Sequence, residues 1–106
     1  MTESERTTQL KEIIAQDPTN TLARYALGME YSSQGDVDAA VAAFRELIVS
    51  NPDYANAYFM AAQALSNAER KDEAKQFLRE GITAAKRANN RHAESEMTAM
   101  LEDLEF

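Results

Sequence analysis

The single histidine of the sequence, His92, is the residue best suited to acid–base or metal chemistry, and Glu96 follows it four positions later. Residues spaced by four share one face of a helix, so this pair could offer two ligands to a metal ion. Two ligands are too few, because the chain of 106 residues has no cysteine and no second histidine to complete a site. We therefore expect both residues to be solvated surface, and we expect the protein to hold no metal or other cofactor.

The serines and glycines offer no stronger chemistry. No nucleophile motif surrounds a serine, and His92 would be the only base able to activate one. None of the 3 glycines belongs to a glycine-rich phosphate-binding loop. The sequence therefore predicts a protein that is not an enzyme.

Charge and hydropathy narrow the classes of partner. The chain carries 18 acidic and 11 basic residues, a formal net charge of −7, so its field repels phosphate backbones and anionic lipids. No apolar run approaches the ~20 residues that span a bilayer, and the polar N-terminal residues lack the apolar stretch of a signal peptide. We expect a cytoplasmic protein that binds neither nucleic acid nor membranes. Three basic residues at four-residue intervals form a ridge on one helix face: Lys71, Lys75 and Arg79. We interpret this ridge first as solvated surface and second as a contact for an acidic partner.

An internal repeat organises the elements that must position any binding surface. Residues 10–14 (LKEII), 44–48 (FRELI) and 78–82 (LREGI) resemble one another, and each segment lies 34 residues after the last. The same offset aligns Asp17-Pro18 with Asn51-Pro52. A fixed period of this length marks stacked units that bury their apolar faces against their neighbours.

Within each period the apolar residues recur at helical spacing, and turn residues separate the runs. Pro18 and Pro52 disfavour helix in the residues before them. Gly35 can adopt the left-handed conformation that ends a helix, and Asp36 can cap the next one. The predicted helices are 3–16, 20–33, 37–50, 54–67, 71–87 and 90–104. They make up one all-α domain over 1–106, with an N-terminal half-repeat helix (3–16), repeat one (20–52), repeat two (54–87) and a C-terminal capping helix (90–104).

One set of residues in repeat one carries a family resemblance: Arg24, Leu27, Gly28, Tyr31, Ala40, Phe44 and Pro52. At the same relative spacings the tetratricopeptide repeat has an aromatic residue, Leu-Gly, Tyr, Ala, Phe and Pro, which this run resembles except at Arg24. The resemblance implies a TPR-like α-solenoid of antiparallel helix pairs, with about two full repeats. Small Gly28 and Ala40 would let the paired helices approach, and Phe44 would fill the space around that contact.

The second copy restores the aromatic residue at Tyr58 but departs elsewhere. Lys86 stands where Pro52 stood, and Glu69 replaces Gly35. We therefore expect the helix at 71–87 to run longer than its counterpart and the turn at Glu69 to use another conformation.

The resemblance also implies a concave groove, lined by the first helix of each pair, that takes an extended peptide or a helix. Carried over position by position, the groove residues are Tyr25, Met29, Ser33, Asn56, Phe59, Met60, Gln63 and Asn67. We expect Tyr25 and Phe59 to act as anchors, with packing inside the core as the alternative. The Lys, Arg and Asn set with which one version of the family clamps a C-terminal carboxylate is missing, so we expect no binding of acidic C-terminal peptides.

The sequence thus predicts a protein–protein interaction module that binds a neutral or hydrophobic peptide or helix of a partner. The alternative is a structural subunit or a weakly self-associating scaffold, because arrays below about three repeats are marginal. Its contact surface would consist of Met97, Met100, Leu104 and Phe106.

Overall fold

The structure, a computed structural model, describes residues 3–105, which form six α-helices and no strand. The helices are α1 (Glu5–Gln16), α2 (Thr21–Ser33), α3 (Val37–Ser50), α4 (Ala55–Asn67), α5 (Lys71–Arg87) and α6 (Arg91–Leu104). Each predicted helix is present, with ends that differ by two residues or fewer. The predicted all-α class is confirmed.

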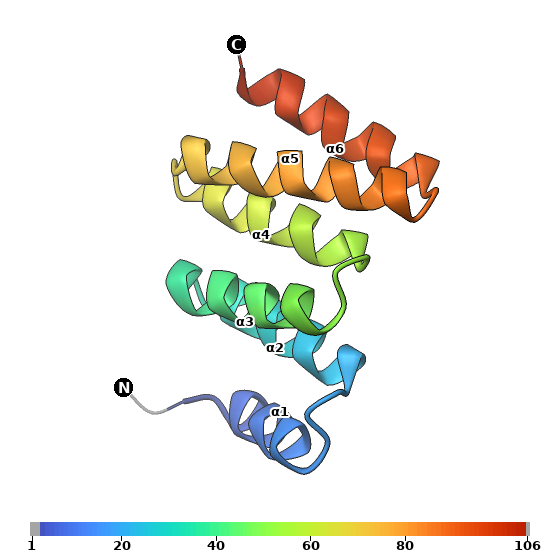
Figure 1. Cartoon of the computed structure of the whole chain (residues 1–106). Coiled ribbons are helices and arrows are strands. Elements are labelled where there is room, and N and C mark those ends of the chain that lie inside the picture. Colours follow the sequence, from blue (N-terminus) through green and yellow to red (C-terminus); the bar gives the residue numbers. More distant parts are fainter. Residues whose placement is uncertain (1–2, 106) are drawn as a thin grey trace.

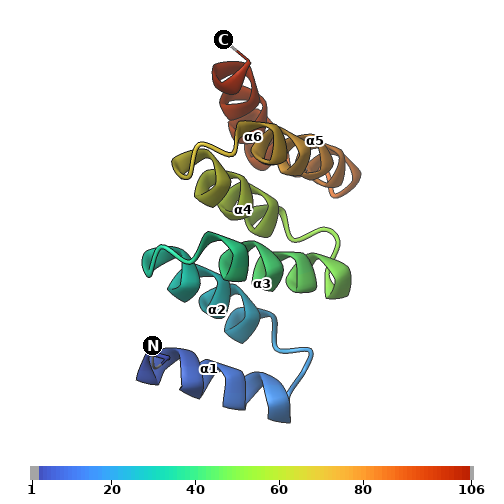
Figure 2. The ribbon, with the colours of Figure 1, turned by 90° about the vertical axis from the view of Figure 1, so that its left-hand side faces the viewer.

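The helices are stacked in chain order, with α1 and α6 at opposite ends of the stack (Figures 1 and 2). Each helix packs against the next one along the chain, and the stack measures 39 × 29 × 17 Å. Contacts beyond these neighbours join α2 to α4 and α4 to α6. This arrangement is a helical repeat solenoid.

The 34-residue period is visible in the backbone itself. Asp17 and Asn51, one period apart, end α1 and α3 with nearly identical dihedral angles, φ −139° and ψ 80° against φ −144° and ψ 81°. Each residue donates its backbone N–H to the carbonyl four residues earlier at 2.8 Å. The two connections that precede α2 and α4 therefore have the same local geometry.

The turns at Gly35, Glu69 and Asn89 share a different geometry, with φ values of 77°, 64° and 58°. In each turn the following residue donates its N–H to the carbonyl five positions earlier, as Asp36 does to Tyr31 at 3.0 Å. This is the hydrogen-bond pattern of the Schellman motif, which requires a left-handed residue.

The expectation that the turn at Glu69 differs from that at Gly35 is wrong. Arg70 donates its N–H to the Leu65 carbonyl at 2.9 Å, so the closing hydrogen bond of the motif forms here as well. Glu69 adopts the conformation that this bond demands, although a non-glycine residue pays roughly 1–2 kcal/mol for it. The longer α5 is confirmed, with 17 residues against 14 in α3.

Close approach of the paired helices depends on small residues. A Cβ atom built on Gly28 of α2 would lie 2.5 Å from the nearest ring atom of Phe44 on α3. Phe44 and Ala40 are both fully buried. The predicted close packing of Phe44 against Gly28 is confirmed, and Ala40 is buried on α3 as expected.

The second repeat uses Gly81 of α5 for the same purpose, in contact with helices on both sides. A Cβ atom there would lie 2.7 Å from Cβ of Tyr58 on α4 and 2.5 Å from Sδ of Met97 on α6. Met97 is therefore fully buried. It cannot serve the self-association surface that the sequence suggested, and Met100 and Leu104 also pack against the core. Phe106 lies outside the described residues.

Arg24, the departure from the family pattern, takes over a hydrogen bond that its aromatic counterpart makes. In the second repeat the Tyr58 hydroxyl donates to the Pro52 carbonyl at 2.6 Å. In the first repeat Arg24 Nε donates to the Pro18 carbonyl at 2.7 Å. Each donor and each acceptor lies 34 residues from its counterpart.

Candidate functional site

The inner face of the stack is formed by α2, α4 and α6. The backbone of α4 contacts those of α2 and α6. Within residues 3–105 the backbones of α1, α3 and α5 do not contact one another in this way. A stack whose alternate helices touch on one side and separate on the other is curved toward the touching side. The predicted groove residues lie on two of these inner helices, α2 and α4.

Four of the predicted groove residues, Tyr25, Met29, Phe59 and Met60, are apolar or aromatic and half-buried. All four pack against the core on one side and remain partly accessible on the other. Tyr25 and Phe59 lie one period apart on α2 and α4, so their side chains project from corresponding positions of neighbouring inner helices. These four partly exposed apolar side chains are here called the groove floor.

Tyr25 packs against two other aromatic rings. Its ring centroid lies 6.0 Å from that of Phe44 and 5.6 Å from that of Tyr54, with tilted rings. Burial raises the pKa of the Tyr25 hydroxyl, and the neighbouring Tyr54 adds to the increase. The ring therefore supports the junction of α2, α3 and α4 as well as lining the inner face.

The other four predicted residues, Ser33, Asn56, Gln63 and Asn67, are exposed and uncharged. The Ser33 hydroxyl donates to the Glu30 carbonyl at 2.9 Å, so its hydrogen is engaged within α2. Asn56 borders a hollow of about 270 Å³ near the start of α4, and Asn67 borders another of about 310 Å³ near its end. The first hollow is lined mostly by polar residues, and the second mostly by small or apolar ones.

The family is decided by comparison with known sequences. A sequence model described as "Tetratricopeptide repeat" matches residues 25–90. The chain belongs to this family. The resemblance predicted from the sequence is confirmed.

Similar proteins support the same fold over nearly the whole chain. The TPR repeat-containing protein PA0015 of Pseudomonas aeruginosa is 27% identical over 96 residues, 91% of each chain. The solution structure of protein BPP2914 from Bordetella parapertussis matches with a TM-score of 0.78 at 25% identity, over 97% of this chain and 89% of that one. The TPR2B domain of yeast Sti1, in a complex with pHsp70, matches with a TM-score of 0.82 at 17% identity, over 93% and 79% of the two chains.

In this TPR chain, α6 carries charged residues that the sequence-based groove omitted. Arg91, Glu94, Thr98 and Glu102 border a shallow hollow on α6. The buried residues of the helix, Ala93 and Met97, lie on another face. The signal that could have found this hollow is the amphipathic pattern of α6, whose buried Met97 fixes which residues face outward.

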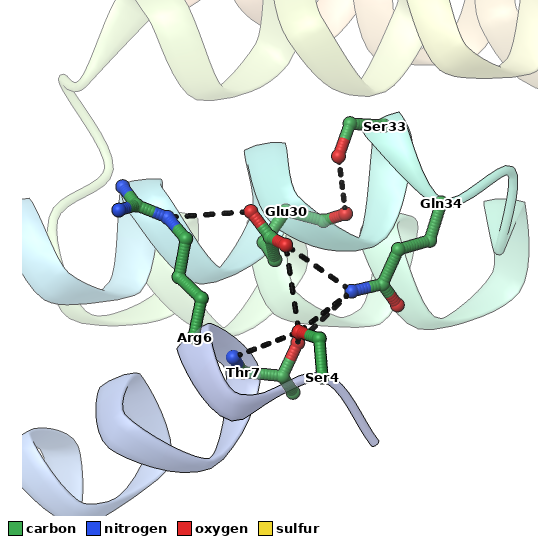
Figure 3. A network of polar contacts seen from close by, with 6 residues as sticks. All are labelled: Ser4, Arg6, Thr7, Glu30, Ser33 and Gln34. Atoms are coloured by element: carbon green, nitrogen blue, oxygen red, sulfur yellow. Dashed lines mark hydrogen bonds and ion pairs between the residues drawn. The ribbon is translucent and has the colours of Figure 1, made fainter. Parts of the chain in front are cut away.

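A polar network that the sequence did not reveal joins α1 to the end of α2 (Figure 3). Gln34 Nε2 donates to Ser4 Oγ at 3.0 Å and to Thr7 Oγ1 at 3.1 Å, and Thr7 is fully buried. Arg6 Nε lies 3.3 Å from the Glu30 carboxylate on the other side of the network. Hydroxyls, an amide and a carboxylate that satisfy one another hold the first helix in place, and the network contains no imidazole or amine to act as a base.

His92 and Glu96 form the pair that their spacing predicts. His92 Nε2 lies 2.8 Å from Glu96 Oε1, and the His92 side chain is 85% exposed. Among residues 3–105 no three His, Cys, Asp or Glu side chains gather as a metal site would require. Nor does any helix in this part of the chain have the length and apolarity needed to cross a membrane.

A further hollow, of about 340 Å³, opens on the outer side of the stack between α1 and α3. Its floor is the α2 surface at Leu27 and Tyr31, and its walls include Lys11, Ala43 and Glu46. Sequence reasoning missed it. The available signal was the difference between Ala43 and the residue one period later, Phe77.

Proposed function

We propose that this TPR chain is a protein-interaction module whose inner groove binds a short neutral or hydrophobic segment of a partner protein. The observation that carries the proposal is the groove floor, four apolar side chains from α2 and α4 that stay partly exposed in a chain with a large core available to them. Side chains of this kind supply most of the binding energy in protein interfaces when a partner covers them.

The charge distribution favours an uncharged segment. The eight groove residues on α2 and α4 carry no charge, and exposed amides at Asn56, Gln63 and Asn67 can pair with the backbone of an extended peptide. An acidic segment would be repelled by a chain of net charge −7. The similar TPR2B domain of yeast Sti1 is a precedent for protein binding on this fold.

Selection from a random peptide library tests the proposal. We expect the wild-type chain to enrich apolar peptides of low acidity, and Phe59→Ala to weaken their binding about tenfold, since an interface anchor contributes roughly 1–2 kcal/mol. Gln63→Arg, at an exposed position, should weaken binding without touching the core. Val49→Ala is the matched control, because Val49 is 75% exposed on α3 and lies outside the groove.

Two results would reject the groove as the binding surface. The first is enrichment of acidic peptides. The second is equal affinity of Gln63→Arg, Phe59→Ala and wild type, measured by calorimetry on variants with unchanged helical content. The alternative function, a structural subunit that self-associates weakly, is tested by sedimentation equilibrium, in which a mass that rises with concentration would support it.

A further inference from the structure

We propose that the outer hollow between α1 and α3 is a second docking site, which receives the aromatic side chain of a partner protein. It lies on the side of the stack opposite the inner groove, and it does not depend on what the groove binds. At the equivalent position one repeat later, the chain fills the corresponding space with its own Phe77 side chain.

Between α3 and α5 the equivalent space is closed by an aromatic ring under a cation. Phe77 of α5 is 5% exposed, and the Arg45 guanidinium of α3 lies 4.2 Å above the centre of its ring. The same guanidinium donates two hydrogen bonds to the Glu80 carboxylate, at 3.0 and 3.2 Å. The α4 residues Ala61 and Leu65 belong to the same buried cluster as Phe77 and are fully buried.

Between α1 and α3 the chain keeps the cation and the carboxylate at equivalent positions, but it lacks the ring and these two charged residues do not pair with each other. Thirty-four residues before Arg45 and Glu80 stand Lys11 and Glu46, again a cation and a carboxylate on alternate helices. Thirty-four residues before Phe77 stands Ala43. Both Lys11 and Glu46 line the hollow, and Ala43 lies in its wall.

The missing ring leaves apolar surface uncovered. Leu27 and Tyr31, the counterparts of Ala61 and Leu65, are both only half-buried and form the floor of the hollow with Ile14 beside them. The volume of about 340 Å³ falls at the lower end of the range for small-ligand sites. The hollow therefore has the size and the apolar floor that suit one aromatic side chain.

The charged residues at the rim are free to rearrange around such a ring. Lys11 pairs with Glu3 and lies 5.9 Å over the Tyr31 ring, and Glu46 pairs with Arg24 at 3.1 Å. The Lys11 and Glu46 side chains are 46% and 70% exposed, so these ion pairs contribute little and can be exchanged. An aromatic ring bound over Leu27 would place its face within reach of the Lys11 ammonium and could form a cation–π interaction. An aliphatic side chain could not form this interaction.

The occupant belongs to another protein rather than to a second copy of this chain. Every aromatic side chain within residues 3–105 is at least half-buried in its own fold. The net charge of −7 also opposes contact between two copies. A partner that presents an exposed Phe or Tyr meets neither obstacle.

The probe for this site is N-acetyl-phenylalanine amide, titrated into ¹⁵N-labelled protein and followed by NMR. We expect saturable shifts at Lys11, Leu27 and Ala43, with a dissociation constant on the order of 1 mM for a ligand of this size. N-acetyl-leucine amide should bind about 2- to 5-fold more weakly, because it lacks the cation–π contact.

Two variants tie the shifts to the hollow. Ala43→Phe supplies the ring from within, as Phe77 does one repeat later, and should abolish the shifts. Gln76→Phe adds a ring at an exposed position of α5 and should leave them intact. Lys11→Met, at an exposed side chain that cannot disturb the core, should reduce binding of the phenylalanine probe to the level of the leucine probe.

The proposal is overturned if both probes bind Lys11→Met and wild type alike, or if the shifts persist in a folded Ala43→Phe. It is also overturned if the wild-type shifts are absent, or cluster on α4 and α6 instead of around the hollow.

Discussion

The variant Gly28→Ala is subject to two physical effects that change the stability of the fold in opposite directions. Alanine is the better helix former, so helix propensity alone predicts a gain in stability of about 1 kcal/mol. In the structure, however, the new Cβ would lie 2.5, 2.7 and 2.8 Å from three atoms of the Phe44 ring, where carbon atoms prefer ~3.5–4.0 Å. Phe44 is fully buried, so α2 and α3 must separate by about 1 Å to relieve the contact.

Overpacking of a buried contact costs ~1–3 kcal/mol, and the enclosed ring places this site toward the upper end. After the helix-propensity gain is subtracted, we expect Gly28→Ala to lower the free energy of unfolding by about 1–2 kcal/mol. Thermal unfolding followed by circular dichroism should show a fall in Tm of ~5–15 °C for a chain of this size.

The double variant Gly28→Ala/Phe44→Leu provides the internal control. Because leucine vacates the space that the new methyl needs, the double variant should lose less stability than the sum of the two single variants. A Tm that rises in Gly28→Ala would show that the Phe44 ring does not limit how closely α2 and α3 approach. Stability losses of the two single variants that simply add up in the double variant would show the same.

Two further predictions concern a turn and a surface ion pair. Glu69→Gly should raise the free energy of unfolding, measured by urea titration, by about 0.5–1 kcal/mol, because glycine adopts the left-handed conformation at φ 64° without strain. Gly35→Ala should lower the free energy of unfolding by roughly 1 kcal/mol for the opposite reason. A change of the same sign in both variants would contradict this explanation of the two turns. The hydrogen bond from Arg70 lowers the pKa of Glu73 below its ordinary value of 4.5, so the folded state gains stability above pH 4.5 and loses it as the pH falls through the lower folded pKa. Arg70→Gln should therefore lie below wild type in Tm at pH 7, and the difference should close in acid and in high salt; a constant difference across pH would exclude the ion pair as its cause.

The sequence predicted the helices and their stacking because these depend on local patterns that recur. Gly28, Ala40 and Phe44 lie at spacings typical of closely packed helices, and the structure places Phe44 against Gly28 with Ala40 buried. The turn at Glu69 could not be predicted in the same way. Glutamate is not a residue type that signals a left-handed conformation, but the hydrogen bond from the Arg70 N–H to the Leu65 carbonyl, which closes the turn, requires that conformation.

The binding surfaces were less accessible to sequence reasoning, for a different reason. The positions of Tyr25 and Met97 follow from the family pattern and from helical periodicity, but the share of each side chain that neighbouring helices cover does not. Tyr25 is covered by Phe44 and Tyr54, and Met97 by the close approach at Gly81. The outer hollow is harder still, because it results from a small residue, Ala43, that looks unremarkable until Phe77 is seen in the equivalent place.

Arg24 bears on how such repeats can be recognised. A comparison by residue type scores arginine in place of tyrosine as a mismatch. Both side chains nevertheless donate a hydrogen bond to the carbonyl of the proline six residues earlier. The quantity that the two repeats share is a donor at a fixed place. A search that scores this position by its capacity to donate a hydrogen bond would detect repeats that a search for aromatic residues misses. In protein design, the two side chains could be exchanged to change the net charge while the hydrogen bond to the proline carbonyl is kept.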